Sequence, residues 1–231
     1  MSDFFGTVFG APVEGAYYLV SAIADAVQPV FGTAATAAAI VLFTMAVRIL
    51  LLPLGFAQAK AERKRTELLP QLKELQDKHK DNPELLQQET LEFYRSSGLF
   101  TGMLPTIAQI PFFFVMYRLF SMPMINGHAN DLLTHDVLGI PLGSYVFGLD
   151  AFSLEAVVVF GALLGLIALV GWWTARRQPP GGPGCLRLVH YVTVVIALFV
   201  PLAAGIYLLV TTAWTAVQRA VLLRDKQDAS S

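Results

Sequence analysis

Residues 34–56 read AATAAAIVLFTMAVRILLLPLGF, an apolar stretch that contains a single charged residue, Arg48. The hydrocarbon core of a bilayer is about 30 Å thick, and a helix needs roughly 20 consecutive apolar residues to cross it. This stretch is long enough, so we predict that it crosses a membrane. It is the first of the predicted spans.

Four further apolar stretches complete a predicted set of five spans. The final apolar region is too long for one helix, and Pro201 with Gly205 indicates two spans joined by a very short turn. The four stretches cover residues 102–120, 152–173, 188–201 and 203–223. We therefore predict an all-α integral membrane protein with five transmembrane helices.

The composition of the whole chain agrees with this fold class. Of its 231 residues, 55% are hydrophobic and only 14% are charged, whereas soluble domains usually contain about 25% charged residues. The net charge of −1 argues against a protein that recognises nucleic acids. The single cysteine, Cys185, excludes a disulfide framework and a multi-cysteine metal site.

The segment before the first span, residues 1–33, is predicted to lie outside the cell. It has no basic residue and therefore lacks the positive start of a cleaved signal peptide. Its apolar run from Tyr17 to Phe31 is interrupted by Asp25 and Gln28. This pattern predicts a helix that lies in the membrane interface rather than a sixth span.

The positions of lysine and arginine predict how the spans are oriented, because cytoplasmic loops are enriched in these residues. Five spans place the loop 121–151 on the same side as residues 1–33, and neither segment contains a basic residue. All 16 basic residues except Arg48 and Arg118 fall on the other side. These residues lie in three places, which are the segment 57–98, the loop 174–187, and the stretch from Arg219 to the end of the tail 224–231. The amino terminus is therefore expected outside and the carboxyl terminus in the cytoplasm.

The long polar segment 57–98 is predicted to form a cytoplasmic amphipathic helical hairpin. Leu68, Leu72 and Leu75 share one helical face, and Asp81-Asn82-Pro83 indicates a turn followed by a helix start. The apolar stripe needs lipid headgroups, another helix or a client protein to cover it. The pattern leaves open both a plain connecting hairpin and a docking or substrate-capturing surface.

Arg48 is the strongest functional signal, because a charge at the centre of a span costs roughly 2.5–3.5 kcal/mol even on the mildest scale. No Asp or Glu lies inside a predicted span to pair with it. One interpretation is an arginine satisfied by carbonyls and lipid phosphate, and the other is a wet pocket open to the cytoplasm. Further polar residues in the spans favour the pocket, although singly such residues often only join helices. They are Thr44, Gln109, Tyr207, Thr211, Thr212, Trp214 and Thr215.

Enzyme chemistry has little support in the sequence. The spans contain no pair of aspartates, and the chain has neither an HExxH motif nor a GxxxxGK[ST] loop. Its four histidines are scattered over both predicted sides of the membrane. We therefore predict no catalytic residue, no cofactor and no metal.

Four sequence blocks carry a resemblance to a known family. They are IVLFTMAVRILLLPLGFAQAKA at 40–61, LLPQLKELQDKHKDNPELLQQETLEFYR at 68–95, GMLPTIAQIPFFFVMYRLF at 102–120 and VPLAAGIYLLVTTAWTAVQR at 200–219. With these blocks the chain resembles the YidC/Oxa/Alb family of membrane protein insertases over nearly all of its length. We expect the short bacterial form, in which no large outer domain precedes the first span.

The resemblance implies a fold, a function and a location. It implies five spans around a positively charged hydrophilic groove that opens to the cytoplasm, in the bacterial plasma membrane. Members of the family insert short hydrophobic proteins, alone or with the Sec translocon, and help others fold without nucleotide or metal. The implied partners are nascent membrane-protein clients, the lipid bilayer, the Sec translocon and the ribosome.

The resemblance also implies residue roles. The groove arginine of the family falls on Arg48, and the threonine one turn earlier falls on Thr44. The glutamine of the LPxLxQxP segment falls on Gln109, and a tyrosine of the last span falls on Tyr207. The neighbouring position, often a second tyrosine in the family, is Leu208 here, and the loop 174–187 does not match the usual family sequence.

Two functions from other classes are alternatives to an insertase. A small transporter or channel would predict internal repeats and paired charges within the membrane, and the sequence has neither. A membrane-protein assembly scaffold would recruit partners through the hairpin without moving a substrate. Only a functional test of Arg48 separates this scaffold from an insertase.

Overall fold

The computed structural model describes residues 2–80, 82–97, 107, 109–148, 153–177 and 192–224. Most of the predicted loop 174–187 lies outside these residues, as do the first residues of three predicted spans and the tail from residue 225. The chain divides into two compact units. The first consists of Met1–Ile49 and Phe112–Gln218, and the second of Leu50–Pro111 and Arg219–Ser231.

The first unit begins with two consecutive helices, α1 over Ser2–Phe31 and α2 over Ala35–Leu50. The short 3-10 turn η1 (Gly32–Ala34) separates them. Gly32 has a φ of +54°, a conformation that glycine reaches at little cost because it has no Cβ. The helix predicted at the interface from Tyr17 to Phe31 is thus the second half of a longer helix.

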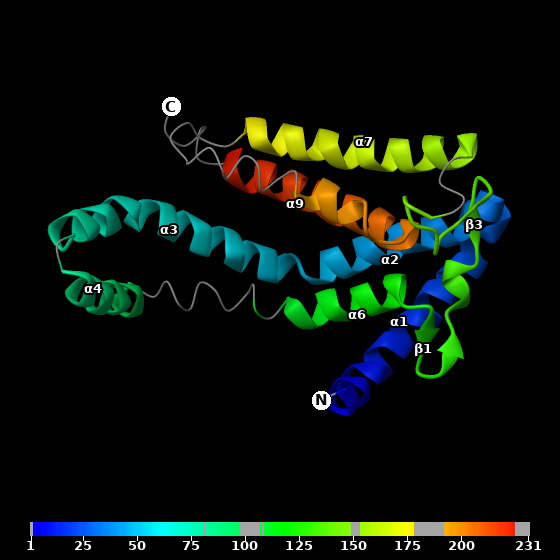
Figure 1. The fold of residues 1–231 in the computed structure, drawn as a ribbon, viewed down its shortest axis with the longest axis horizontal. Helices are drawn as coiled ribbons and strands as arrows, with labels where there is room; N and C mark the ends of the chain where they lie inside the picture. Colours follow the sequence, from blue (N-terminus) through cyan, green and yellow to red (C-terminus); the bar gives the residue numbers. More distant parts are fainter. Residues whose placement is uncertain are drawn as a thin grey trace. The chain divides into compact units, whose positions relative to one another are not determined.

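Three more named helices belong to this unit, and residues 192–197 are helical as well. They are α6 (Ile110–Ser121), α7 (Leu154–Arg176) and α9 (Leu202–Arg224). α7 begins at the N-cap Ser153, whose Oγ accepts a hydrogen bond of 3.1 Å from the Ala156 N–H. Figure 1 shows α7 and α9 running side by side, and they meet closely at Leu163 and Gly205.

One apolar core joins the helices of the first unit. Its most deeply buried members come from α1, α2, α6, α7 and α9 and from the segment between α6 and α7, and they include Val20, Ile40, Leu119, Phe120, Leu142 and Ile167. Apart from Glu155 and Arg176 near its two ends, the exposed large side chains of α7 are also apolar, namely Leu154, Val157, Val158, Leu166, Leu169 and Trp172. A helix that is apolar on both its buried and its exposed face is typical of one that contacts lipid.

Within the described residues, length and composition mark two stretches as candidate membrane spans, Gly10–Leu50 and Leu154–Arg176. The first stretch comprises most of α1 together with η1 and α2. α6 is equally apolar but shorter than a full span over its described residues. These stretches agree with a helical membrane protein, whereas the number of five spans stays a prediction.

The segment 122–148, predicted only as an outer loop, folds into two small β-hairpins. β1 (Met124–Ile125) pairs with β2 (His128–Ala129), and β3 (Asp136–Val137) pairs with β4 (Ile140–Pro141), both antiparallel. Both residues of each two-residue turn have positive φ, as a type I′ turn requires. The turns are Asn126-Gly127 and Leu138-Gly139.

This segment covers the ends of two helices of the first unit. Asn130, only 2% exposed, donates from Nδ2 to the carbonyls of Leu119 at 2.7 Å and Met122 at 2.9 Å, at the carboxyl end of α6. At the start of α9, the N–H of Leu202 donates to Ser144 O, and the N–H of Ala203 to Leu142 O, both at 2.9 Å. Backbone groups that helix ends leave without a partner are thereby satisfied.

The second unit contains a helical hairpin, α3 (Leu52–Lys78) followed by α4 (Pro83–Ser96). The two helices are in contact, and Figure 1 shows α4 beside the end of α3 that leads into it. Asn82 caps α4, because its Oδ1 accepts a hydrogen bond of 3.3 Å from the Leu85 N–H, and Pro83 occupies the first helical position. The sequence pattern at 81–83 predicted this helix start.

The predicted span 34–56 is divided between two helices. α2 ends at Leu50, Leu51 forms a turn, and α3 begins at Leu52. Pro53 explains the break, because proline has no N–H for the helix ladder and its ring clashes with the carbonyl four residues earlier. Residues 52–56 therefore continue directly into the first helix of the hairpin.

Candidate functional site

Arg48 lies in the last turn of α2, and its side chain is half-buried. Its guanidinium is close enough to the Tyr207 hydroxyl of α9 for an electrostatic interaction. Among the residues that the structure describes, Arg48 has no hydrogen-bond or ion-pair partner. The sequence predicted an arginine without an acidic partner, and the structure places Tyr207 beside it.

Tyr207 joins three helices of the first unit at this point. It is 9% exposed, and its ring packs on Phe120 of α6 with centroids 5.9 Å apart and an interplanar angle of 37°. The hydroxyl end of the ring lies beside Thr211, one turn further along α9, and faces Arg48 of α2. The aromatic contact fixes the ring, so the hydroxyl is held at a set position next to the charge.

Tyr207, Thr211, Trp214 and Thr215 follow one another at helical spacing and form what we call the polar stripe of α9. Thr215 Oγ1 donates to Thr211 O at 2.8 Å, so this hydroxyl is satisfied within the helix. Thr211 Oγ1 and Trp214 Nε1 are buried without a hydrogen-bond partner among the described residues. A buried polar group left unpaired costs about 1–3 kcal/mol, which suits this stripe to contact with water or a polar ligand.

Like Thr215, two more of the predicted threonines form hydrogen bonds within their own helices. Thr44 is 1% exposed and donates from Oγ1 to Ile40 O at 2.6 Å. Thr212 Oγ1 donates to the carbonyls of Leu208 at 2.8 Å and Leu209 at 3.0 Å. Such bonds to the preceding turn satisfy a hydroxyl inside an apolar bundle, so neither proton is free for a ligand.

Gln109, the remaining predicted site residue, belongs to the second compact unit. Its side-chain oxygen accepts a hydrogen bond of 3.1 Å from Gln58 Nε2 of α3, within the same unit. Gln58 was not among the predicted site residues, although it lies in the block at 40–61 that carries the resemblance. Its position only two residues after the end of the apolar stretch gave no separate signal.

Phe120 is a further residue that the sequence reasoning missed. It appeared only as the last residue of an apolar stretch, and nothing in the sequence pairs it with Tyr207. In the described part of the chain, no group of three or more His, Cys, Asp or Glu side chains is placed to hold a metal ion. The chemistry of this site therefore consists of one positive charge, a phenol hydroxyl and the polar stripe of α9.

Comparison with known proteins gives the family context of this arrangement. Residues 26–229 match the family described as 60Kd inner membrane protein. A relative from Chlorobium limicola, named Membrane protein insertase YidC, is 28% identical over 188 residues, which cover 78% of this chain and 32% of the relative. Relatives of the same name from Aquifex aeolicus and Treponema denticola are 27% identical over 202 residues and 36% identical over 115 residues.

Two of these matches cover most of this chain, and all three cover a smaller part of the relatives. The aligned region is 83% of this chain and 37% of the relative from Aquifex aeolicus, and 49% and 19% for Treponema denticola. The chain thus spans about a third of the length of the first of these relatives. The family match includes Arg48, Tyr207 and the polar stripe of α9. The chain belongs to the 60Kd inner membrane protein family, the YidC/Oxa family of helical membrane proteins.

Proposed function

We propose that this protein is a membrane protein insertase and chaperone that moves short hydrophobic clients from the cytoplasm into the bilayer. The observation that carries the proposal is Arg48, a half-buried charge in an apolar bundle whose only described electrostatic partner is the neutral Tyr207. The name of its relatives, membrane protein insertase YidC, supports the same function. The action needs no catalytic residue, because no covalent bond is made or broken.

The proposed mechanism lowers the cost of moving a polar segment through hydrocarbon. An acidic client tail loses its hydration when it enters the bilayer, and an unpaired charge there is very costly. Arg48 and the polar stripe of α9 form one wall of a hydrophilic groove that attracts the tail and shortens the dry path. The apolar helix of the client then moves sideways into lipid, driven by burial of its own apolar surface.

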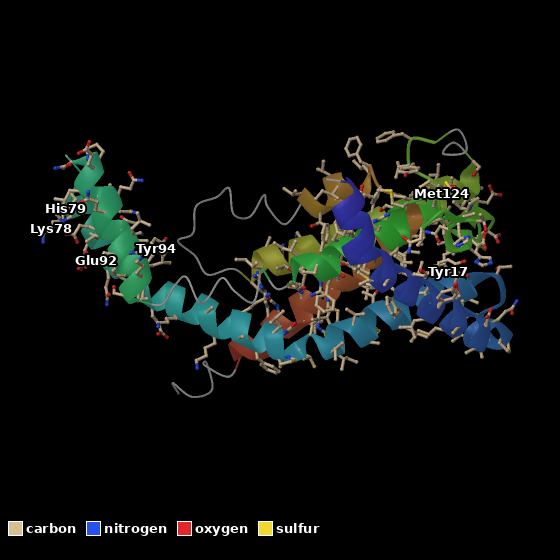
Figure 2. The ribbon with its side chains drawn as sticks, turned by 90° about the horizontal axis from the view of Figure 1, so that it is seen from below. Tyr17, Lys78, His79, Glu92, Tyr94 and Met124 are labelled. Carbon is tan, nitrogen blue, oxygen red and sulfur yellow. The ribbon has the colours of Figure 1, made fainter. Side chains whose placement is uncertain are left out.

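The hairpin of α3 and α4 is proposed as the cytoplasmic surface that first meets clients. Leu69, Leu85 and Leu91 are exposed on it, so its apolar side is not fully covered by the hairpin itself. Figure 2 shows Lys78 and His79 at the end of α3 and Glu92 and Tyr94 on α4. Charged side chains beside exposed leucines fit a surface for nascent chains, with the ribosome and the Sec translocon as proposed partners.

The proposed orientation has five spans, an outer amino terminus and a cytoplasmic carboxyl terminus, and it predicts which cysteines an impermeant reagent reaches. In a Cys185→Ser background, His128→Cys places a thiol at an exposed position of the β1–β2 hairpin. We expect this thiol to be labelled by an impermeant maleimide in intact cells. Lys78→Cys, exposed at the end of α3, should be labelled only after the membrane is opened. If only Lys78→Cys is labelled in intact cells, the orientation is the opposite of the one proposed.

Reconstitution tests the proposed function itself. A single-span client with a short acidic amino-terminal tail is synthesised in the presence of liposomes that contain the purified protein or no protein. We expect the protein to raise the protease-protected fraction of client several-fold over empty liposomes. Equal protection in both, over clients with different tail charges, would contradict insertase activity and favour the assembly scaffold.

A further inference from the structure

The carboxyl end of α7 carries two arginine–tryptophan pairs that the proposed insertion mechanism does not use. The sequence from 172 to 177 is WWTARR. The Arg176 guanidinium carbon lies 4.0 Å from the centroid of the Trp172 ring, and that of Arg177 lies 4.1 Å from the centroid of the Trp173 ring. Each arginine is four residues after its tryptophan, the spacing that brings side chains of one helical face together.

Both arginines stay exposed although they are held on aromatic rings. A guanidinium over an indole is attracted by the ring's electron-rich face. Its N–H donors lie in the guanidinium plane and so remain free to bind the oxygens of a phosphate. The two pairs therefore present two oriented positive groups at neighbouring positions on the helix surface.

The rest of α7 places these pairs at the level of lipid headgroups. α7 has 23 residues, about 35 Å at 1.5 Å per residue, which is close to the thickness of a bilayer core. Its exposed apolar side chains run from Leu154 to Trp172, immediately before the two arginines. Tryptophan is enriched at membrane interfaces because its ring is apolar and its N–H is polar.

The charged side chains of this helix favour an anion at its carboxyl end. The only acidic residue of α7 is Glu155, in its first turn, while Arg176 is in its last turn. The helix dipole is negative at the carboxyl end, so attraction of an anion there has to come from the two guanidinium groups. An arginine pair is well suited to phosphate, which it can bind through two parallel hydrogen bonds.

We propose that Arg176 and Arg177 bind the phosphate of an anionic phospholipid, with Trp172 and Trp173 holding the guanidinium groups in place. With the orientation proposed above, this lipid lies in the cytoplasmic leaflet. The site would anchor the end of α7 at a defined depth. It prefers anionic lipids because the ammonium of a zwitterionic headgroup is repelled by the same two charges.

Fluorescence quenching by brominated lipids tests this proposal directly. In a Trp214→Phe background, Trp172 and Trp173 are the only tryptophans, since the chain has three. The protein is placed in phosphatidylcholine vesicles that contain a small, equal fraction of brominated phosphatidylglycerol or brominated phosphatidylcholine. We expect the phosphatidylglycerol to associate roughly thirtyfold more strongly, the scale for two basic side chains near an anionic headgroup.

Two double variants in the same background locate the effect. Arg176→Gln with Arg177→Gln should remove the preference for phosphatidylglycerol, whereas the control Lys78→Gln with Lys80→Gln removes the same charge from the hairpin and should keep it. Arg176→Lys with Arg177→Lys keeps the charge without the planar group, and it should retain less than half of the preference.

Three results would overturn the proposal. They are equal quenching by the two brominated lipids in the starting protein, an equal loss in the hairpin control, and full retention in the lysine variant. The last would reduce the site to diffuse attraction of charge. The measurement contains no client protein, so its failure is distinct from a failure of the insertase assay.

Discussion

Replacing Arg48 by alanine is expected to reduce insertion of a client with an acidic tail by about tenfold, the largest functional effect of a single substitution in this chain. Two opposite charges 4 Å apart attract by about 4 kcal/mol at an effective dielectric constant of about 20. A third of that energy already corresponds to about a tenfold change. The described residues offer no second cation or hydrogen-bond partner at Arg48 that would compensate. The measurement is protease protection of the client in reconstituted liposomes.

The client and a second arginine supply the controls for this experiment. A client whose tail acids are changed to amides should depend on Arg48 much less, because the attraction needs both charges. Arg48→Lys should retain a large part of the activity. Arg118→Ala removes another half-buried arginine from the last turn of a helix, α6, and should change insertion less than twofold. If Arg48→Ala inserts both clients as well as the unchanged protein does, the charge is not the centre of the mechanism.

The helices of this protein could be predicted from hydrophobic patterning and from a few residues that end helices. The apolar stretches predict helices, because a backbone segment that faces lipid can satisfy its hydrogen bonds within its own helix. In the polar hairpin, Asn82 and Pro83 indicated the start of α4 because a cap and a proline have fixed roles at that point. The break at Leu51 was harder to place, because Pro53 within an apolar stretch can either bend a helix or end it.

The small hairpins of the segment 122–148 could not be predicted in the same way. Strands of two residues are too short to show an alternating pattern. Asn126-Gly127 is a familiar turn signal, but Leu138-Gly139 is not, because a leucine with a φ of +52° is unusual. The contacts of this segment with the ends of α6 and α9 join residues far apart in the sequence, and no local pattern reports them.

The candidate site could be predicted only in part, because contacts between helices leave no local pattern in the sequence. Arg48 was evident as a charge within an apolar stretch, whereas its proximity to Tyr207 depends on how α2 packs against α9. Helical spacing places Thr44 on the same face of α2 as Arg48. Thr44 is nevertheless fully buried, whereas Arg48, one turn later, is half-buried. Of the polar residues on α9, only the structure separates those bonded within the helix from those left unpaired.

Replacing Gly205 by valine is expected to destabilise the first unit by about 2 kcal/mol, the largest expected effect on stability. A Cβ at this position would lie 2.6 Å from Cδ2 of Leu163 on α7, well inside contact distance. Leu163 is buried, so its side chain has little room to move away. Overpacking of this kind typically costs about 1–3 kcal/mol, and small residues are what allow helices in membranes to approach closely. The check is the unfolding temperature in detergent micelles.

A second substitution in the facing helix decides whether this contact is the cause. Leu163→Ala alone leaves a cavity and should destabilise the protein, but combined with Gly205→Val it should recover at least half of the loss, since the valine fills that space. Gly165→Val on the same α7 helix meets no atom within 4 Å and should have little effect. Additive losses in the double variant would exclude direct contact as the cause.

Gly205 also affects the candidate site, because Tyr207 lies only two residues after it. The distance between α7 and α9 that this glycine permits therefore helps to set where the Tyr207 hydroxyl meets Arg48. Gly205→Val should therefore lower insertion as well as stability, and Leu163→Ala should restore both together.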